Sequence, residues 1–95
     1  LKMMVSKTTT NFAGKRGIEL SIETGYNKFE EFETLCIWES DNDCEWLCSY
    51  RVNGDGSFTW NANIYLKKEV MEELPALIKD EKHLRQVIQF ISENI

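Results

Sequence analysis

The stretch "CEWLCSYRVNGDGSFTWNANIY", residues 44–65, decides the fold. Apolar and aromatic side chains alternate with polar ones on both sides of a segment that contains two glycines. This is the pattern of strands that bury one face. The short connection favours an antiparallel hairpin, because parallel neighbours need a long crossover. We predict strands at 44–52 and 58–65, joined by a loop at 53–57 whose two glycines adopt positive φ angles.

The loop shares some residues with a calcium-binding loop. If Asn53, Asp55 and Gly56 occupy its third, fifth and sixth positions, Arg51 stands at the first position and Ala62 at the twelfth. A calcium loop requires oxygen ligands at both places, with a bidentate carboxylate at the twelfth. We therefore interpret the segment as a hairpin loop and predict no metal site in it.

Alternation predicts three further strands. Residues 4–12 are rich in threonine and indicate the first of them. Apolar and polar residues alternate from Ile18 onward and give the second, which Gly25 closes. Residues 32–39 form the third. With the hairpin, these segments predict a sheet that occupies the first two thirds of the chain.

The last third has helical spacing. The segment "KKEVMEELPALIKD", residues 67–80, has an apolar stripe that Pro75 interrupts with a kink or break. Asp80 is placed to cap a last amphipathic helix. The chain is therefore expected to be a single α+β domain over residues 1–95, with strands at about 4–65 and helices at about 67–79 and 81–94. Its architecture is an antiparallel four- to five-stranded meander sheet with two C-terminal helices packed on one face.

The pairing of the strands can be predicted as well. A three-residue loop at 41–43 would place Trp38 opposite Trp46 and Cys36 opposite Cys48, and the glycine loop would place Tyr50 opposite Trp60. The even-numbered strand residues would then form the buried face. Its members are Ile18, Leu20, Ile22, Phe32, Cys36, Trp38, Cys44, Trp46, Cys48, Tyr50, Val52, Phe58, Trp60, Ala62 and Ile64.

Composition limits the function classes. Sixteen acidic residues against eleven basic ones give a net charge of -5, a poor balance for holding a phosphate backbone. It suits a partner with a basic surface. No apolar run is long enough to span a membrane, and we expect no signal peptide. Three cysteines without such a signal would be free thiols in a reducing compartment. We expect a cytoplasmic protein.

The odd-numbered strand residues give the candidate binding site. They combine glutamates with a few apolar side chains, so an acid-rimmed apolar strip on an open sheet could dock a basic partner. The same pattern also occurs on solvent faces that only maintain solubility. The predicted partner-binding residues are Glu19, Glu33, Leu35, Ile37, Glu39, Glu45 and Leu47, with Glu23 on the same face.

No constellation of residues indicates catalysis. Zinc prefers four ligands, often in closely spaced cysteine pairs, and Cys36, Cys44 and Cys48 have only His83 to join them. A Cys36–Cys48 disulfide is conceivable in an oxidised sample, although three buried thiols acting as apolar side chains is the simpler interpretation. The carboxylates at 41, 43 and 45 suit an ordinary turn. We predict no enzyme, no cofactor and no metal.

Three classes of function remain. The first is a small acidic, non-enzymatic protein-binding module, for example a phage-type inhibitor or DNA mimic that occupies a basic site on a nucleic-acid-processing protein. The alternative is a single-stranded nucleic-acid-binding protein that stacks bases on an open sheet face. A spatial cluster of Lys15, Arg16, Arg51 and Lys67 would favour the alternative. A small enzyme subunit, or a homodimer whose sheet edges pair, is the third class.

Overall fold

The computed structural model describes residues 5–26, 28–41 and 45–95. Five strands form one antiparallel sheet in the order β1-β2-β3-β4-β5, which is also their order in the sequence. The predicted α+β class and meander are confirmed. The elements are α1 (Lys7–Gly14), β1 (Ile18–Tyr26), β2 (Glu31–Glu39), β3 (Cys48–Val52), β4 (Phe58–Asn63), α2 (Lys68–Glu72), β5 (Leu77–Ile78) and α3 (Glu81–Glu93).

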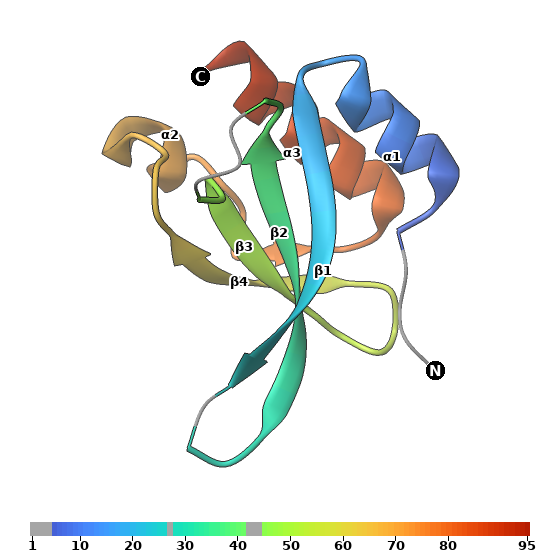
Figure 1. Ribbon diagram of the computed structural model, residues 1–95, viewed down its shortest axis with the longest axis vertical. Coiled ribbons are helices and arrows are strands. Elements are labelled where there is room, and N and C mark those ends of the chain that lie inside the picture. The colour runs from blue at the N-terminus through green and yellow to red at the C-terminus, as the bar shows by residue number, and fades with distance from the viewer. Residues whose placement is uncertain (1–4, 27, 42–44) are drawn as a thin grey trace.

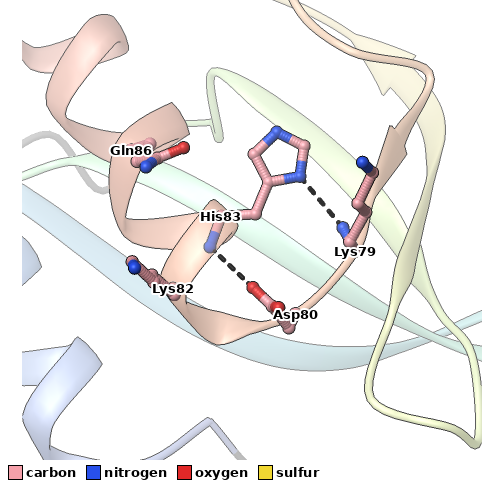
Figure 2. Close-up of a pocket in the computed structure, with 5 residues that line it drawn as sticks. All are labelled: Lys79, Asp80, Lys82, His83 and Gln86. Atoms are coloured by element: carbon pink, nitrogen blue, oxygen red, sulfur yellow. Dashed lines mark hydrogen bonds between the residues drawn. The ribbon is translucent and has the colours of Figure 1, made fainter.

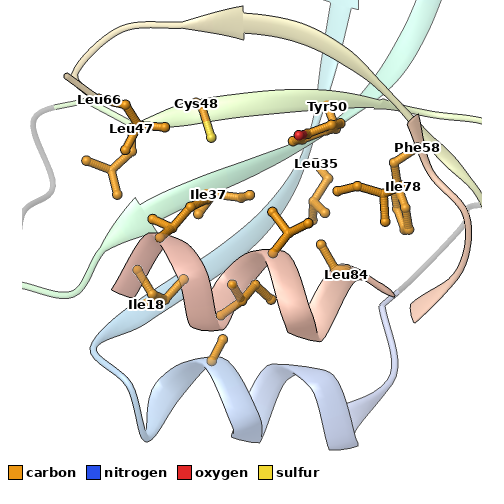
Figure 3. Close-up of a cluster of buried hydrophobic side chains, with 14 of the residues drawn as sticks. Ile18, Leu35, Ile37, Leu47, Cys48, Tyr50, Phe58, Leu66, Ile78 and Leu84 are labelled. Carbon is orange, nitrogen blue, oxygen red and sulfur yellow. The ribbon is translucent and has the colours of Figure 1, made fainter. Parts of the chain in front are cut away.

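Helices α1 and α3 lie side by side against one face of the twisted sheet (Figure 1), which we call the inner face. The amphipathic helix α3 buries Leu84, Ile88 and Ile91 completely, as its predicted stripe requires. Figure 3 shows the apolar side chains of the strands that meet the helices, among them Leu35 and Ile37. Each such side chain contributes about 1.5–3 kcal/mol when fully buried.

The strand predicted at 4–12 is wrong, because the described part of this segment forms most of helix α1. Threonine favours strands by intrinsic preference, but hydrogen bonds reverse that preference here. The Ser6 hydroxyl caps the helix by accepting from the Thr9 backbone N–H, at 3.4 Å. The Thr9 hydroxyl, fully buried, donates to Glu81 Oε1 at 2.6 Å, and Ser6 Oγ donates to the same oxygen at 2.6 Å. Glu81 thus joins the beginnings of α1 and α3.

The register between β2 and β3 differs by one residue from the predicted one. Ile37 lies opposite Cys48 and Cys36 opposite Ser49, so Cys36 and Cys48 point to opposite faces. The connection is longer than the predicted three-residue loop: β2 ends at Glu39 and β3 begins only at Cys48. Asn42, Asp43 and Cys44, on which that loop was built, lie outside the described residues.

With this register, the odd-numbered side chains of β2 face the helices, whereas the even-numbered ones were predicted to do so. Leu35 and Ile37 are fully buried on the inner face, whereas Phe32, Cys36 and Trp38, expected inside, lie on the other face, which we call the outer face. The remaining predicted even-face residues divide. Ile18, Leu20, Ile22, Cys48, Tyr50, Val52, Phe58 and Trp60 belong to the core or pack against it, Trp46 and Ala62 are half-buried outside it, and Ile64 is exposed.

The pairing of β3 with β4 was predicted correctly near the loop. Tyr50 lies opposite Trp60, and a register shift follows beyond it. Within the loop, Asp55 Oδ1 accepts from both the backbone N–H and the hydroxyl of Ser57, and Gly56 has a positive φ of 93°. Gly54 is not among the residues with positive φ, so only one of the two glycines supplies the predicted conformation. The Asp55 carboxylate holds the turn itself.

Pro75 ends the helical segment earlier than predicted. Helix α2 stops at Glu72, and residues 77 and 78, expected to be helical, form the short strand β5 beside β4. Proline cannot donate a backbone hydrogen bond and disfavours helix around it. Its carbonyl accepts the hydroxyl of the fully buried Tyr50 at 2.8 Å. The break in the helix therefore places the Pro75 carbonyl within hydrogen-bonding distance of the buried Tyr50 hydroxyl.

Tyr50→Phe should lower the free energy of unfolding by about 1–2 kcal/mol, because the Pro75 carbonyl loses its hydroxyl donor inside the protein. Chemical denaturation followed by tryptophan fluorescence measures the change. Tyr65→Phe is the matched control, since Tyr65 is 59% exposed and should unfold like the parent. Equal stability of the two variants would contradict the role of the Tyr50–Pro75 hydrogen bond.

The pH dependence of stability should reveal Glu81. Partial burial raises the pKa of this carboxyl, but hydrogen bonds from Ser6 and Thr9 and the charge of Arg85 outweigh burial and hold the pKa below its usual value of 4.5. A carboxyl with a depressed pKa stabilises the fold above its unfolded pKa, and the contribution is lost as pH falls through the folded pKa. Glu81→Gln should therefore melt below the parent at pH 7, and the difference should shrink as pH falls below about 4.5. A difference that is independent of pH would show that charge has no part in the link.

Candidate protein-binding surface

Helices α1 and α3 leave the outer face of the sheet uncovered. The strand registers place Trp38 opposite Glu19, Cys36 between Ser21 and Ser49, and Thr34 beside Arg51 on this face. Phe32 and Trp38 are half-buried, whereas Thr34, Cys36 and Ser49 are buried beneath their neighbours. The face therefore has a floor of small polar side chains and an aromatic side chain towards each end of β2.

Hydrogen bonds fix the tryptophan end of this face. Trp38 Nε1 donates to Ser21 Oγ at 2.8 Å, and Ser21 Oγ donates to Glu23 Oε2 at 2.9 Å. Thr34 Oγ1 donates to the Glu23 carbonyl at 3.1 Å. The indole is thereby held in one orientation with part of its surface open to solvent, which lowers the entropy lost when a partner covers it.

The other end of the face extends into a hairpin arm. Residues 24–26 of β1 and 31–33 of β2 pair with each other beyond the last β2–β3 pair, and Figure 1 shows this hairpin projecting from the body. We call residues 24–26 and 28–33 the arm. The Phe32 ring lies against Gly25, and the Arg51 guanidinium lies over the same ring at 4.6 Å and pairs with Glu30 at 2.6 Å. These contacts brace the arm from β3.

Charge is unequally distributed between sheet and helices. Residues 18–63, which form the first four strands and their connections, contain ten acidic and two basic residues, and the rest of the chain contains six acidic and nine basic ones. The two basic residues are Lys28 in the arm and Arg51, whose charge is paired with Glu30. The segment that forms the first four strands is therefore strongly negative, although the whole chain has a charge of only -5.

The predicted binding strip is wrong in its apolar part. Leu35 and Ile37 are fully buried, and Leu47 is 5% exposed, so none of them can meet a partner. The predicted glutamates do not share one face either. Glu19 and Glu23 are exposed on the outer face, Glu33 and Glu39 have the inner-face parity of β2, and Glu45 is exposed in the β2–β3 connection.

On the outer face, Phe32, Trp38 and Arg51 stand where the sequence predicted Leu35, Ile37 and Leu47. The sequence shows an alternating β2 but both of its faces carry apolar residues, so alternation alone could not assign the buried one. The cluster of Lys15, Arg16, Arg51 and Lys67 is not formed. Arg51 is on the outer face, while Arg16 lies on the helical side, donating to Gln89 at 2.5 Å and stacking on Phe12.

The described thiols, Cys36 and Cys48, are buried and protonated. Burial raises the pKa of Cys36, and burial raises the pKa of Cys48 to about 12, so neither is ionised near neutral pH. Their opposite orientations do not fit the Cys36–Cys48 disulfide that the sequence left open for an oxidised sample. Cys44 lies outside the described residues, as does Asp43. In the described parts of the chain, no group of three or more metal-binding side chains occurs.

A shallow hollow of about 260 Å³ opens at the beginning of α3 (Figure 2). It is lined by Lys79, Asp80, Lys82, His83 and Gln86. Its polar groups serve the helix: Asp80 Oδ1 accepts from the His83 backbone N–H, and His83 Nδ1 accepts from the Lys79 backbone N–H. The two lysines lie on opposite sides of His83 and do not converge on a common point. Asp80 and His83 are therefore engaged at the beginning of α3.

Comparison with known proteins gives no relative: no family model, curated protein or solved structure matches the chain. Among the helices described here, none is long and apolar enough to cross a membrane.

The brace of the arm can be tested at Gly25. A Cβ atom there would lie 2.8 Å from the Phe32 ring, which Arg51 holds from above. Gly25→Ala should therefore cost about 1–3 kcal/mol of unfolding free energy, the range for overpacking. Gly54→Ala is the control, because nothing lies within 4 Å of its Cβ position. A Gly25→Ala protein as stable as that control would show that Phe32 moves away freely.

Proposed function

We propose that this chain is a non-enzymatic protein-binding module that presents the outer face of its sheet to a basic surface of another protein. The observation that carries the proposal is the separation of charge: the sheet segment has ten acidic residues against two basic ones, and the helices cover only the inner face. Complementary potentials of this kind accelerate association and select partners.

The contact would centre on Trp38. Its indole is half-buried, held by Ser21, and directly opposite Glu19. An aromatic anchor with charged neighbours is typical of the residues that dominate protein–protein contacts. Glu19 and Glu23, both exposed, would stand at the rim, where charge acts on association rate and salt dependence.

A basic nucleic-acid site is the partner surface that these properties fit best. A negative sheet that occupies such a site would block it, which is the action of an inhibitor or DNA mimic. The burial and raised pKa of Cys36 and Cys48, and the use of Asp80 and His83 in capping α3, support a binding role without catalysis.

Single-stranded nucleic acid is the second candidate, since Phe32 and Trp38 are aromatic side chains on an uncovered sheet face. Charge argues against it. Among the described outer-face strand residues, Arg51 is the one cation and it is already paired with Glu30. A phosphate backbone would meet Glu19 and Glu23 instead.

The test is a set of charge reversals. The partner for the test is a protein that the parent chain captures and that is then purified. The double variant Glu19→Lys with Glu23→Lys should associate with it more slowly than the parent, and its association rate should depend less on salt concentration. Glu72→Lys with Glu73→Lys makes the same charge change on the exposed end of α2 and should leave association at the sheet close to that of the parent. Trp38→Ala should raise the dissociation rate by tenfold or more, the effect expected of an anchor residue.

Equal effects of the sheet and α2 reversals would count against the outer face, because they would reflect net charge alone. Fluorescence titration with an oligothymidylate separates the two candidates. We expect no binding at physiological salt. Binding that Trp38→Ala abolishes would replace the protein-binding proposal with the nucleic-acid one.

A further inference from the structure

The two edges of the sheet differ in length and protection. At one edge, β5 is two residues long and lies between Pro75 and Lys79. At the other edge, β1 is nine residues long, contains no proline, and pairs with β2 in one uninterrupted register. Its two charged residues, Glu19 and Glu23, both lie on the outer face. Soluble proteins usually shorten, bend or charge such an edge, because its unpaired backbone groups attract other strands.

No strand among the described residues pairs with the other side of β1, which we call the free edge, and the backbone groups there can be assigned. The Gly17 carbonyl accepts from the Ser40 N–H at 2.9 Å, so odd-numbered residues direct their N–H and C=O groups towards β2. Even-numbered residues of β1 therefore direct theirs outward. Their side chains include the half-buried Leu20 and Ile22 and the 72% exposed Tyr26, so a strand added here would also cover apolar surface.

We propose that two copies of this chain pair through their β1 edges, antiparallel about a two-fold axis at Ile22, to form one continuous sheet. Ile22 is the midpoint of β1, so this register uses the whole strand. It places Ile18 opposite the partner's Tyr26 and Leu20 opposite the partner's Thr24 on the inner face.

Charge selects this register over its neighbours. A two-fold axis at Ser21 would set Glu19 against the partner's Glu23, and an axis at Glu23 would set the two Glu23 side chains against each other. Like charges directly opposite destabilise a pair of strands. With the axis at Ile22, Glu19 faces the partner's Gly25 and Glu23 faces the partner's Ser21.

Charges outside the paired strands are also complementary between the two copies. Residues 5–17, which lead through α1 into Ile18, carry three cations and no acid, and Lys15 is exposed. Because Ile18 would lie opposite the partner's Tyr26, Lys15 would approach the partner's arm, where the exposed Glu31 pairs with Tyr26. The helical side of one copy would thus meet the acidic arm of the other. The pairing uses the backbone edge of β1, whereas Trp38 lies on β2. Trp38→Ala therefore tests the outer face without altering the paired strands, and the two proposals can fail separately.

Sedimentation velocity on the parent chain over a concentration series tests the pairing. We expect a species of twice the 11.1 kDa chain mass. Thr24→Lys places a charge at the free edge and should weaken the dimer at least tenfold. Thr59→Lys, the same change at an exposed position of β4, is the control and should keep the parent's dimer. Circular dichroism confirms that both variants fold.

Charge exchange tests the register itself. Lys15→Glu and Glu31→Lys should each weaken the dimer, and the double variant should restore it, because both contacts are then re-formed with opposite sign. A parent that sediments at the mass of one chain at every concentration overturns the proposal. A dimer that Thr24→Lys leaves intact, or a double variant no tighter than the single ones, overturns the β1 interface.

Discussion

The pairing of Ile37 with Cys48 is the constraint on which the rest of the sheet depends. It places Leu35 and Ile37 beneath α3, where both are fully buried, and so fixes which side of β2 the helices cover. Because neighbouring residues of a strand point to opposite faces, the same pairing sends Cys36 and Trp38 outward. The candidate binding surface is thus a direct consequence of how the core is packed.

The packing of α1 beside α3 depends on hydrogen bonds as well as on apolar contacts. Glu81 accepts hydrogen bonds from Ser6 and Thr9, so the first turns of α1 and α3 are held together by one carboxylate. Arg85 adds a hydrogen bond to Thr9 Oγ1 at 2.9 Å. These bonds favour the helix in a threonine-rich segment, because the buried hydroxyl of Thr9 has its partners Glu81 and Arg85 when the chain folds as α1.

Sequence patterns predicted the parts of the fold that local chemistry determines. The cap at Asp80, the stripe of α3 and the hairpin at Asn53–Ser57 each rest on residues close together in the chain. The pattern of β2 could not be resolved in this way, because Leu35 and Ile37 alternate with Cys36 and Trp38 and either pair could be buried. The choice depends on the long connection to β3, and its geometry is not encoded in a turn motif.

The candidate site was predicted only in its charge. The glutamates at 19 and 23 lie on the outer face as expected, but Leu35 and Ile37 were assigned to that face through the one-residue error in register. Leu47 was assigned there as a strand residue, whereas β3 begins only at Cys48 and Leu47 is buried before it. The acidic character survives the error because it belongs to the whole segment 18–63 rather than to one parity of residues. A property that is spread over a segment tolerates a register shift, whereas a property of alternate residues is reversed by it.

The two proposals have a common geometric consequence. Strands that pair edge to edge about an axis perpendicular to the sheet keep both inner faces on one side and both outer faces on the other. Two copies joined at β1 would therefore present the Trp38 surfaces side by side, with Glu19 and Glu23 of each copy near the shared axis. The negative potential would be strongest at the centre of this surface. A partner with one extended basic patch could then contact both copies at once, and the second contact would benefit from the high effective concentration created by the first.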